Sequence, residues 1–565
     1  MALSSILLHP AGAALVTLAL SLFLYLASAR RPRITRSGQA LRKPPGTVPI
    51  LGNGLIFLRP RHKLFDWFSR CEQHFGLETF EISVPTLPPG VVINNPENLD
   101  YVFKNEALFQ KGDLFRQLSW DLFGNGIINA DGALWKAQRK AGLHFLSAEN
   151  LKVLNDAALP AYLGKSMRQI ARTAAPPGSE RDSNATVLDL QHVFHEITSQ
   201  VMGKLAYDME MHTGDEFTAA FEHASGCTTE RFQNPLWFIT EVFFGSKFRQ
   251  SLRTIRSVGG NIVESAREKR AQTAKRDTNT ADDEADKSGS AAHSGDAELD
   301  GISGSLIYSL IDTLGEDKKL VADAALNYLS AGRDTVAQAL TWTMYLLMKH
   351  ESATAQILEE ITQLRASVAT DNTRPPAPTF QHERLTQPDD DEGTYHSTAE
   401  LFTPAKVPYT MAVFYESLRL YPPVPFEIKQ CTAAVTLPDG THLPQGTVIF
   451  WSPWSMNRSR AIWGPDAETF RPERWLFQEE ADDSENKRLV LKTRPAAEFP
   501  VFNGGQRLCL GKKMAELMAA QIIPSLVEKF EFVPGFDVHG EERISGSSLT
   551  LPMKDGLPCV AVLRG

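Results

Sequence analysis

The hydrophobic positions of this chain follow helical spacing over most of its length. The longest such pattern runs from about Asp317 to Lys349, and it is apolar on more than one side, as in "AALNYLSAG" and "ALTWTMYLLM". A helix that is hydrophobic nearly all round belongs in the middle of a large domain. At about 1.5 Å per residue, this helix would be roughly 50 Å long. We therefore predict a long central helix in a mainly helical body.

A stretch from Val435 to Trp451 is the clearest exception to the helical pattern. Its residues favour β-strands, and the turn sequences "PDG" and "PQG" interrupt them. Helical spacing returns at Lys512, in "KKMAELMAAQIIPSLVEKF". The predicted fold class is accordingly mainly α with minor β.

The N-terminus holds a charge-free stretch of 19 residues, 11–29, and four arginines follow it between residues 30 and 36. A stretch of that length can span a bilayer core as one helix, and positive charge after the span keeps the downstream chain in the cytoplasm. A cleaved signal peptide is the alternative, because "LASA" resembles a cleavage site. We predict an uncleaved transmembrane anchor over residues 1–30. We expect a single-pass protein of the endoplasmic reticulum membrane with its main body in the cytosol.

Beyond the anchor, the pattern predicts a short connection and one large domain. Residues 31–53 are basic and rich in proline, so they form a predicted stiff hinge, with a plain linker as the alternative. Residues 54–565 form the predicted domain. Three polar segments interrupt it, near residues 268–305, 367–398 and 477–489. We expect these to be disordered insertions, because they hold too few apolar side chains to order themselves.

Composition narrows the class of protein further. The 565 residues are 42% hydrophobic and 22% charged, which suits a globular protein with a large core. A net charge of -9 gives no indication of nucleic-acid binding. The cysteines are widely spaced and form no CxxC pair, which argues against a zinc site and against a disulfide framework. They are Cys71, Cys227, Cys431, Cys509 and Cys559.

Cys509 lies in a glycine-rich loop, "FNGGQRLCLG", directly before the helical pattern that starts at Lys512. Backbone N–H groups at a helix start are unpaired and carry partial positive charge, so they lower a thiol pKa and donate hydrogen bonds to the sulfur. Glycines let the backbone pack closely against a flat ligand, and Arg507 can reach an anionic group on it. A buried structural cysteine beside a turn is the alternative for this loop taken alone.

The spacing of this loop resembles the haem-binding motif of the cytochrome P-450 family, F-x-x-G-x-R-x-C-x-G. Every fixed position is present, as Phe502, Gly505, Arg507, Cys509 and Gly511. In that family the cysteine thiolate is the axial ligand of the haem iron and favours O–O cleavage. The resemblance implies the cytochrome P-450 fold and a haem-thiolate catalytic domain over residues 54–565. It also implies haem b as the cofactor, with Cys509 as the metal ligand.

Two further groups of residues follow the family's motifs and their order. "ESLR" and "FRPERW" supply Glu416, Arg419 and Arg474, which resemble the buried lock behind the haem. "LWKAQRK" supplies Trp135 and Arg139, which are similar to the family's haem-propionate contacts. Taken alone, the Glu416–Arg419 spacing also suits an exposed ion pair on one helix face. Trp135 and Arg139 would likewise suit one core residue and one surface residue.

"AGRDT", in the middle of the long central helix, resembles the oxygen-binding stretch of the family. The resemblance implies that Thr335 holds dioxygen and a water by hydrogen bonds, and that Asp334 helps to deliver protons. A threonine that bonds back to a helix carbonyl is the alternative. The chain departs from the family at Lys429, where a propionate-binding arginine is expected, and at Val336, where a second threonine is common. Ala331 replaces the glutamate that binds haem covalently in one branch, so no ester bond is predicted.

The implied reaction is the insertion of one oxygen atom from O2 into a lipophilic substrate. "AGRDT" and "NGIINADGALWKAQRK" resemble the ω-hydroxylases of alkanes and fatty acids in fungi and plants. Terminal or subterminal hydroxylation of a fatty acid, an alkane or the acyl chain of a metabolite such as a glycolipid is therefore expected. A hydroxylase of a terpenoid or polyketide stays open as an alternative. So do a haem-thiolate isomerase or dehydratase, a non-enzymatic haem-binding protein and a structural membrane protein.

Electrons must come from a partner, because the sequence contains no flavin or nicotinamide domain. The resemblance implies NADPH–cytochrome P-450 reductase, with cytochrome b5 as a second candidate donor. A basic face would steer such an encounter. Its candidate residues, for which an ordinary solvated helix surface is equally open, are Lys136, Lys140, Lys512 and Lys513.

Overall fold

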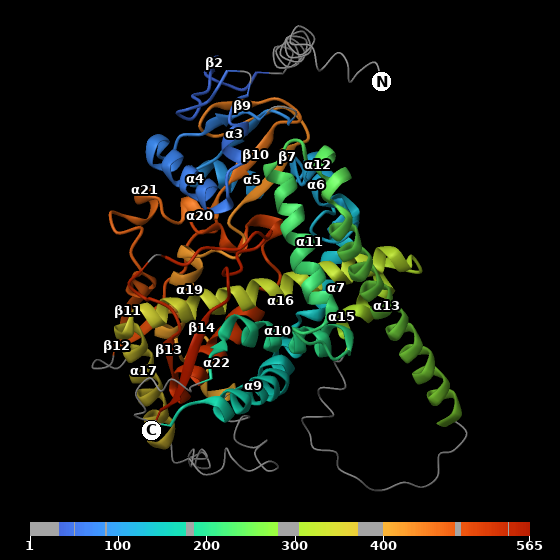
Figure 1. Cartoon of the computed structure of the whole chain (residues 1–565), viewed down its shortest axis with the longest axis vertical. Coiled ribbons are helices and arrows are strands. Elements are labelled where there is room, and N and C mark those ends of the chain that lie inside the picture. The colour runs from blue at the N-terminus through green and yellow to red at the C-terminus, as the bar shows by residue number, and fades with distance from the viewer. Residues whose placement is uncertain are drawn as a thin grey trace.

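Helices arranged around one long central helix make up most of the described chain in this computed structural model (Figure 1). The structure describes residues 33–49, 51–84, 87–176, 186–280, 304–370, 399–480, 487–540 and 542–564. The mainly α fold with minor β is confirmed over these residues. The predicted anchor, residues 1–30, lies outside them. Within the described ranges, no helix is both long and apolar enough to cross a bilayer.

The central helix, α16, spans Lys318–Lys349 and matches the prediction closely. Asp317 caps its start by accepting a hydrogen bond from the backbone N–H of Leu320 at 3.0 Å. Nearly every later residue of the helix is buried, because other helices cover it on several sides. The helices that contact it most extensively are α6 (Gly112–Phe123), α10 (Leu190–Tyr207), α13 (Ser246–Thr280), α15 (Ser305–Leu314), α17 (Glu351–Thr370), α19 (Pro408–Leu420) and α22 (Lys512–Lys529).

Shorter helices complete the body. They are α3 (Gly54–Phe57), α4 (Arg61–Phe75), α5 (Pro96–Lys104), α7 (Gly132–Phe145), α8 (Ala148–Val153), η1 (Leu154–Ala158), α9 (Leu159–Thr173), α11 (Glu216–Gln233), α12 (Trp237–Phe244), α20 (Pro453–Met456), α21 (Arg460–Trp463), η3 (Pro472–Trp475), η4 (Pro500–Phe502) and η5 (Gly505–Arg507). The predicted helix after Cys509 is confirmed as α22, which starts at Lys512.

The strands form small sheets, of which the largest has the order β3-β4-β10-β7-β5. Its strands β10 and β4 run parallel, and its other neighbours are antiparallel. A second sheet has the order β2-β1-β9-β8, a third β13-β14-β6, and β11 pairs with β12. The strands are β1 (Thr35–Arg36), β2 (Gln39–Ala40), β3 (Phe80–Ile82), β4 (Gly90–Val92), β5 (Phe109–Gln110), β6 (Leu188–Asp189), β7 (Glu427–Cys431), β8 (Val435–Thr436), β9 (Thr441–Leu443), β10 (Val448–Trp451), β11 (Leu476–Glu480), β12 (Lys487–Leu491), β13 (Phe530–Pro534) and β14 (Pro558–Leu563).

The predicted β-like stretch from Val435 to Trp451 is confirmed as β8, β9 and β10. Both predicted turns carry a glycine with positive φ, Gly440 at +80° and Gly446 at +82°. Packing of the helices joins most buried apolar side chains into one large cluster, which runs from Phe65 to Ala561. The core is therefore built from residues spread over nearly the whole described chain.

Regular secondary structure extends into two of the predicted insertions. Helix α13 continues as far as Thr280, well inside the segment 268–305. The segment 477–489 begins and ends in paired strands, because β11 and β12 form an antiparallel ladder. Leu476 and Leu491, opposite each other in that ladder, pack against the main core and tie both strands to it. Residues 281–303, 371–398 and 481–486 lie outside the described chain.

Candidate active site

Cys509 lies between η5 and the start of α22, in the loop that the sequence predicts. Its backbone N–H donates to the carbonyl of Phe502 at 2.8 Å, which closes the loop. Water reaches the side chain, yet the surrounding protein is close enough that burial raises the pKa of the Cys509 thiol. The backbone N–H groups of Gly511 and Lys512 point at the sulfur and oppose this rise, as does the positive charge of Arg139. These groups favour the thiolate form.

The two fixed glycines of this loop have different structural roles. Gly505 has a φ of +57°, and a Cβ atom there would lie 2.0 Å from the carbonyl oxygen of Phe103 on α5. Gly505 is therefore needed for the close contact between the cysteine loop and α5. The sequence motif, in contrast, attributes this glycine to cofactor binding. Gly511 has a φ of -80°, and its nearest neighbour to an added Cβ is the sulfur of Cys509 at 3.9 Å. Gly511 keeps the space beside the sulfur open.

Arg507 and Lys429 meet at a shared carboxylate. Arg507 Nε lies 2.5 Å from one oxygen of Glu106, and Lys429 Nζ lies 2.5 Å from the other. Arg507 also reaches Asp131 at 2.7 Å, and its guanidinium lies 4.2 Å from the ring centroid of Trp135. Burial lowers the pKa of Lys429, and Glu106 raises it again. The structure brings these predicted haem contacts together, and it adds two acids that no sequence motif marks.

Arg139 connects α7 to the cysteine loop. Its Nη1 donates to the carbonyl of Leu508 at 3.0 Å, and its guanidinium lies 5.4 Å from the ring of Trp135, one turn away on the same helix. Trp135 is buried, whereas Arg139 is half-buried. Trp135, Arg139 and Arg507 therefore form one aromatic and cationic group, which Arg139 joins to the cysteine loop.

Glu416 and Arg419 are fully buried, which excludes the exposed ion pair as their arrangement. Arg419 donates to the Glu416 carboxylate from Nε at 2.8 Å and from Nη2 at 2.7 Å. Arg474 Nε and Trp475 Nε1 donate to the same carboxylate at 3.0 and 2.9 Å. Arg419 further donates to the carbonyl of Asn457 at 2.6 Å. These contacts fasten α19 to η3 and to the loop after α20.

The middle of α16 has an open face, although its flanks are buried. Ala331 is exposed, and Gly332 and Thr335 are half-buried. The hydroxyl of Thr335 donates to the carbonyl of Ala331 at 2.7 Å, so the back-bonded conformation is present. A Cβ atom on Gly332 would lie 2.6 Å from the sulfur of Met202, so this glycine allows α10 to approach. The face around Ala331 and Thr335 is therefore not covered by the neighbouring helices.

Asp334 is buried and held by its own neighbour in the sequence. Arg333 Nε lies 2.6 Å from Asp334 Oδ1, and Arg333 Nη1 donates to Thr218 on α11 at 3.0 Å. His195 Nδ1 lies 3.8 Å from the same carboxylate. Burial lowers the pKa of His195 to about 4, so its ring is neutral at pH 7. The sequence analysis did not assign roles to Arg333 and His195, although the adjacent cation was a visible signal for Arg333.

A large cavity lies among α4, α6, α11 and the largest sheet. The space within it and in front of its open mouth amounts to about 1010 Å3, solvent included, and apolar side chains line most of the wall. Leu118 on α6, Phe232 on α11 and Leu549 contribute to its wall. Its charged members are Arg61 and Glu427. A space of this kind suits a mainly apolar small molecule.

The residues beside Cys509 fit a haem group. The sulfur is accessible and has two N–H donors, which a thiolate ligand requires. Arg139 and Trp135 supply charge and an aromatic surface for propionates, whereas Arg507 already pairs with Glu106 and Asp131 and would have to share its donors with one. Lys429 is only 2% exposed and already binds Glu106 and the carbonyl of Phe109, so its predicted propionate contact gains no support from this geometry.

Comparison with known proteins agrees with this arrangement. The family model for cytochrome P-450 matches residues 43–386 and 395–560. Cytochrome P-450 94A1 of Vicia sativa is 27% identical over 527 residues, which cover 91% of this chain and 89% of the relative. Cytochrome P-450 94B1 of Arabidopsis thaliana is 26% identical over 500 residues, covering 87% and 86%. Cytochrome P-450 704B1 of Arabidopsis thaliana is 26% identical over 515 residues, covering 89% and 92%. Because the family model spans most of its length, this chain belongs to the cytochrome P-450 family of haem-thiolate monooxygenases.

Proposed function

We propose that this monooxygenase hydroxylates a long aliphatic chain at or near its end, in a fatty acid, an alkane or the acyl chain of a metabolite. The cavity carries the proposal, because apolar side chains line most of it. Each buried CH2 group contributes about 0.8 kcal/mol, so a long alkyl chain gains most from such a wall. The resemblance of "AGRDT" to the ω-hydroxylases of alkanes and fatty acids supports the same substrate class.

Haem b bound through Cys509 would supply the oxygen-activating chemistry. The backbone N–H groups of Gly511 and Lys512 stabilise negative charge on the sulfur. Arg139 and Arg507 would hold the propionates in place. These side chains fix the orientation of the cofactor, and the lock around α19 keeps the wall behind it rigid.

Proton delivery falls to the residues at the open face of α16. The Thr335 hydroxyl donates a hydrogen bond to the backbone carbonyl of Ala331, so the lone pairs of the Thr335 oxygen stay free to accept a hydrogen bond from a water. Asp334 is engaged by Arg333 at 2.6 Å, so it can pass a proton towards Thr335 only after its carboxylate turns away from the guanidinium. We propose this exchange as the step that Arg333 controls.

We propose NADPH–cytochrome P-450 reductase as the electron donor, with cytochrome b5 as a second donor. The bond from Arg139 to Leu508 ties α7 to the loop that precedes α22, which supports a docking face formed by the lysines of both helices. Lys136, Lys140 and Lys513 are exposed. Lys512 is half-buried and lies 3.9 Å from Glu516, which makes it the weakest of the four docking candidates.

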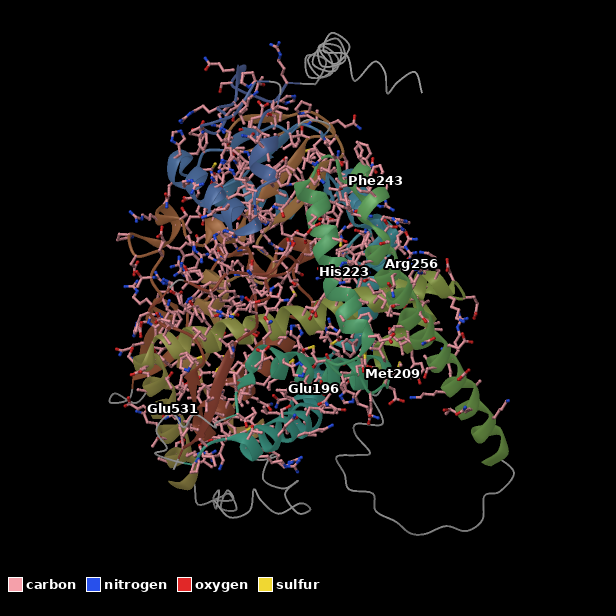
Figure 2. All side chains as sticks on the ribbon, viewed as in Figure 1. Glu196, Met209, His223, Phe243, Arg256 and Glu531 are labelled. Atoms are coloured by element: carbon pink, nitrogen blue, oxygen red, sulfur yellow. The ribbon has the colours of Figure 1, made fainter. Side chains whose placement is uncertain are left out.

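We propose that the protein sits on the cytosolic face of the endoplasmic reticulum membrane, held by the predicted anchor at residues 1–30. The surface of α12 supports contact with lipid, because none of its residues is buried. Val242, Phe243 and Phe244 are 69%, 74% and 83% exposed. Figure 2 labels Phe243 at the outer edge of the molecule. A cluster of large apolar side chains in this position is typical of a surface that meets a membrane or a partner.

Turnover with purified reductase and NADPH tests the proposal. Hexadecanoate, hexadecane, a terpene and a polyketide would be offered under 18O2, and products would be identified by mass spectrometry. We expect one 18O atom at or near the end of the aliphatic substrates. A product without 18O would indicate an isomerase or dehydratase, and haem binding without any product would indicate a non-enzymatic role. Turnover of the terpene or polyketide alone would refute the aliphatic substrate class.

A further inference from the structure

Arg61 is a buried cation for which the described residues provide no counterion. It is the first residue of α4 and is 9% exposed. Its Nε and Nη1 atoms make no hydrogen bond, and no described acid lies within ion-pair distance of it. Its guanidinium lies 5.3 Å from the ring of Phe65, which is the one favourable contact of its charge that the described residues show. An unpaired buried charge is strongly destabilising, so this position is costly to the free protein.

The position of Arg61 on its helix adds to this cost. The N-terminus of a helix carries partial positive charge, and a cation there is unfavourable. The first turn of α4 contains no acidic residue that would compensate. An anion bound beside Arg61 would neutralise the guanidinium and reduce the excess of positive charge at this end of the helix. Both features indicate the same missing partner, an anionic group.

Arg61 lines the large apolar cavity. The other polar side chains of that wall already have partners. Glu427 lies 3.2 Å from Lys111, the amide of Gln233 donates to two backbone carbonyls, and the hydroxyl of Thr229 donates to a helix carbonyl. Arg61 is therefore the polar group of the described cavity wall that stays available to a bound molecule.

The cavity extends from α4 to elements that are attached to α16. Leu118 on α6 lines it, and α6 packs against α16. Leu549 lines it as well, and the two residues after Leu549 bind to Gln338 of α16. The Nε2 atom of Gln338 donates to the hydroxyl of Thr550, and its Oε1 atom accepts from the N–H of Leu551, both at 2.8 Å. In Figure 1, α4 lies with the N-terminal strands, away from α16. Arg61 therefore lines the cavity from α4, whereas Leu118 and Leu549 line it from elements attached to α16.

We propose that Arg61 binds the carboxylate of a long-chain alkanoate and so directs the far end of the chain towards α16. This inference rests on the proposed aliphatic function and adds an acidic head group to it. The planar guanidinium can bind a carboxylate through two parallel hydrogen bonds. Burial lowers the pKa of Arg61 to about 9, which leaves the side chain charged at pH 7. The apolar remainder of the wall accommodates the alkyl chain.

Spectral titration of the full-length, haem-loaded protein tests the inference. Dodecanoate and dodecanol have equal chain lengths and differ in the charge of the head group. We expect Arg61→Gln to raise the Kd for dodecanoate about 10- to 100-fold, since a hydrogen bond to a charged group is lost. Its Kd for dodecanol should stay within about 2-fold. Arg61→Lys keeps the charge without the planar fork and should give an intermediate Kd for dodecanoate.

Lys63→Gln provides the matched control. Lys63 also lies in the first turn of α4, but its side chain is 57% exposed, so its loss removes one charge without touching the cavity. We expect unchanged affinity for both ligands.

The hydroxylated products give a second measurement, because Arg61→Gln should spread hydroxylation over more carbon atoms of dodecanoate than the wild type does.

The outcomes separate this inference from the proposed function. Equal weakening of both ligands in Arg61→Gln would show a packing role and refute carboxylate binding. Unchanged affinity for both ligands would refute it as well, and would leave the aliphatic substrate class intact. If the wild type bound and hydroxylated neither ligand, the proposed aliphatic function would fail, and this inference with it. A reduced, CO-bound spectrum of each variant checks that the haem site is formed.

Discussion

The substitution Glu416→Gln is the sharpest test of the lock behind the site. The Glu416 carboxylate is fully buried and accepts hydrogen bonds at both oxygens. Oε1 accepts from Arg419 Nη2, from Arg474 Nε and from the backbone N–H of Arg471, at 2.7, 3.0 and 2.9 Å. Oε2 accepts from Arg419 Nε and Trp475 Nε1, at 2.8 and 2.9 Å. Every neighbour of this carboxylate is a donor.

A glutamine keeps the shape of the side chain but removes the charge and one acceptor. If its NH2 group takes the place of Oε2, it faces Arg419 Nε and Trp475 Nε1, which are donors themselves. Two hydrogen bonds are then lost. A hydrogen bond to a charged group contributes about 1.5–3 kcal/mol, and breaking a buried ion pair costs about 3–5 kcal/mol. These figures describe overlapping effects, so we expect a loss of about 4 kcal/mol. Globular proteins have free energies of unfolding of about 5–15 kcal/mol, so this loss is a large part of the total.

Urea unfolding of the haem-loaded protein measures the loss, followed by tryptophan fluorescence and by the absorbance of the haem. Glu528→Gln is the matched control, because Glu528 pairs with Arg365 at 2.5 Å while both side chains stay about 30% exposed. Ion pairs of this kind contribute about 0–1 kcal/mol. If Glu416→Gln destabilised the protein no more than Glu528→Gln does, the reasoning from buried charge would be wrong.

Three further predictions concern the site and its surroundings. Cys509→Ser should abolish the absorption band near about 450 nm of the reduced, CO-bound protein, and survival of that band would exclude Cys509 as the ligand. Burial lowers the pKa of His195 from 6.5 to about 4, so between these values the unfolded chain binds a proton that the folded protein does not. The free energy of unfolding should therefore decrease as the pH is lowered from 6.5 to about 4, by up to about 1.4 kcal/mol per pH unit. Urea titrations of His195→Gln should lack this contribution. Gly505→Ala should destabilise the protein by at least about 2 kcal/mol because of strain and a backbone clash, whereas Gly511→Ala should change its stability little; equal effects in urea unfolding would contradict the geometry.

Features that depend on local spacing could be predicted from the sequence. The bounds of α16 follow from its apolar pattern and from Asp317, which caps it. The partners Glu416 and Arg419 lie three residues apart on one helix, so their contact is a property of helical geometry. Their complete burial is not, because it depends on η3 and on the loop after α20, which pack around them only in the folded chain.

Contacts between distant residues could not be predicted in this way. Glu106 joins Arg507, which lies 401 positions later, and no spacing rule connects them. The role of Gly505 shows the same limit. The motif assigns it to the cofactor, whereas the structure places the carbonyl of Phe103 within 2.0 Å of any Cβ atom there. One sequence motif thus contains residues that ligand binding requires together with residues that the fold requires.

Arg61 shows how a functional signal can be absent from the sequence and clear in the structure. In the sequence it is one of three neighbouring basic residues at a helix start, which is typical of a solvated surface. The fold instead places its side chain in a mainly apolar wall, with no described acid within ion-pair distance, at the positive end of α4. Each of these features is unfavourable, and residues that break several local rules at once are most often retained for function. An anionic substrate would relieve all of them together, so its head group should stabilise the protein more than a neutral chain of equal length does.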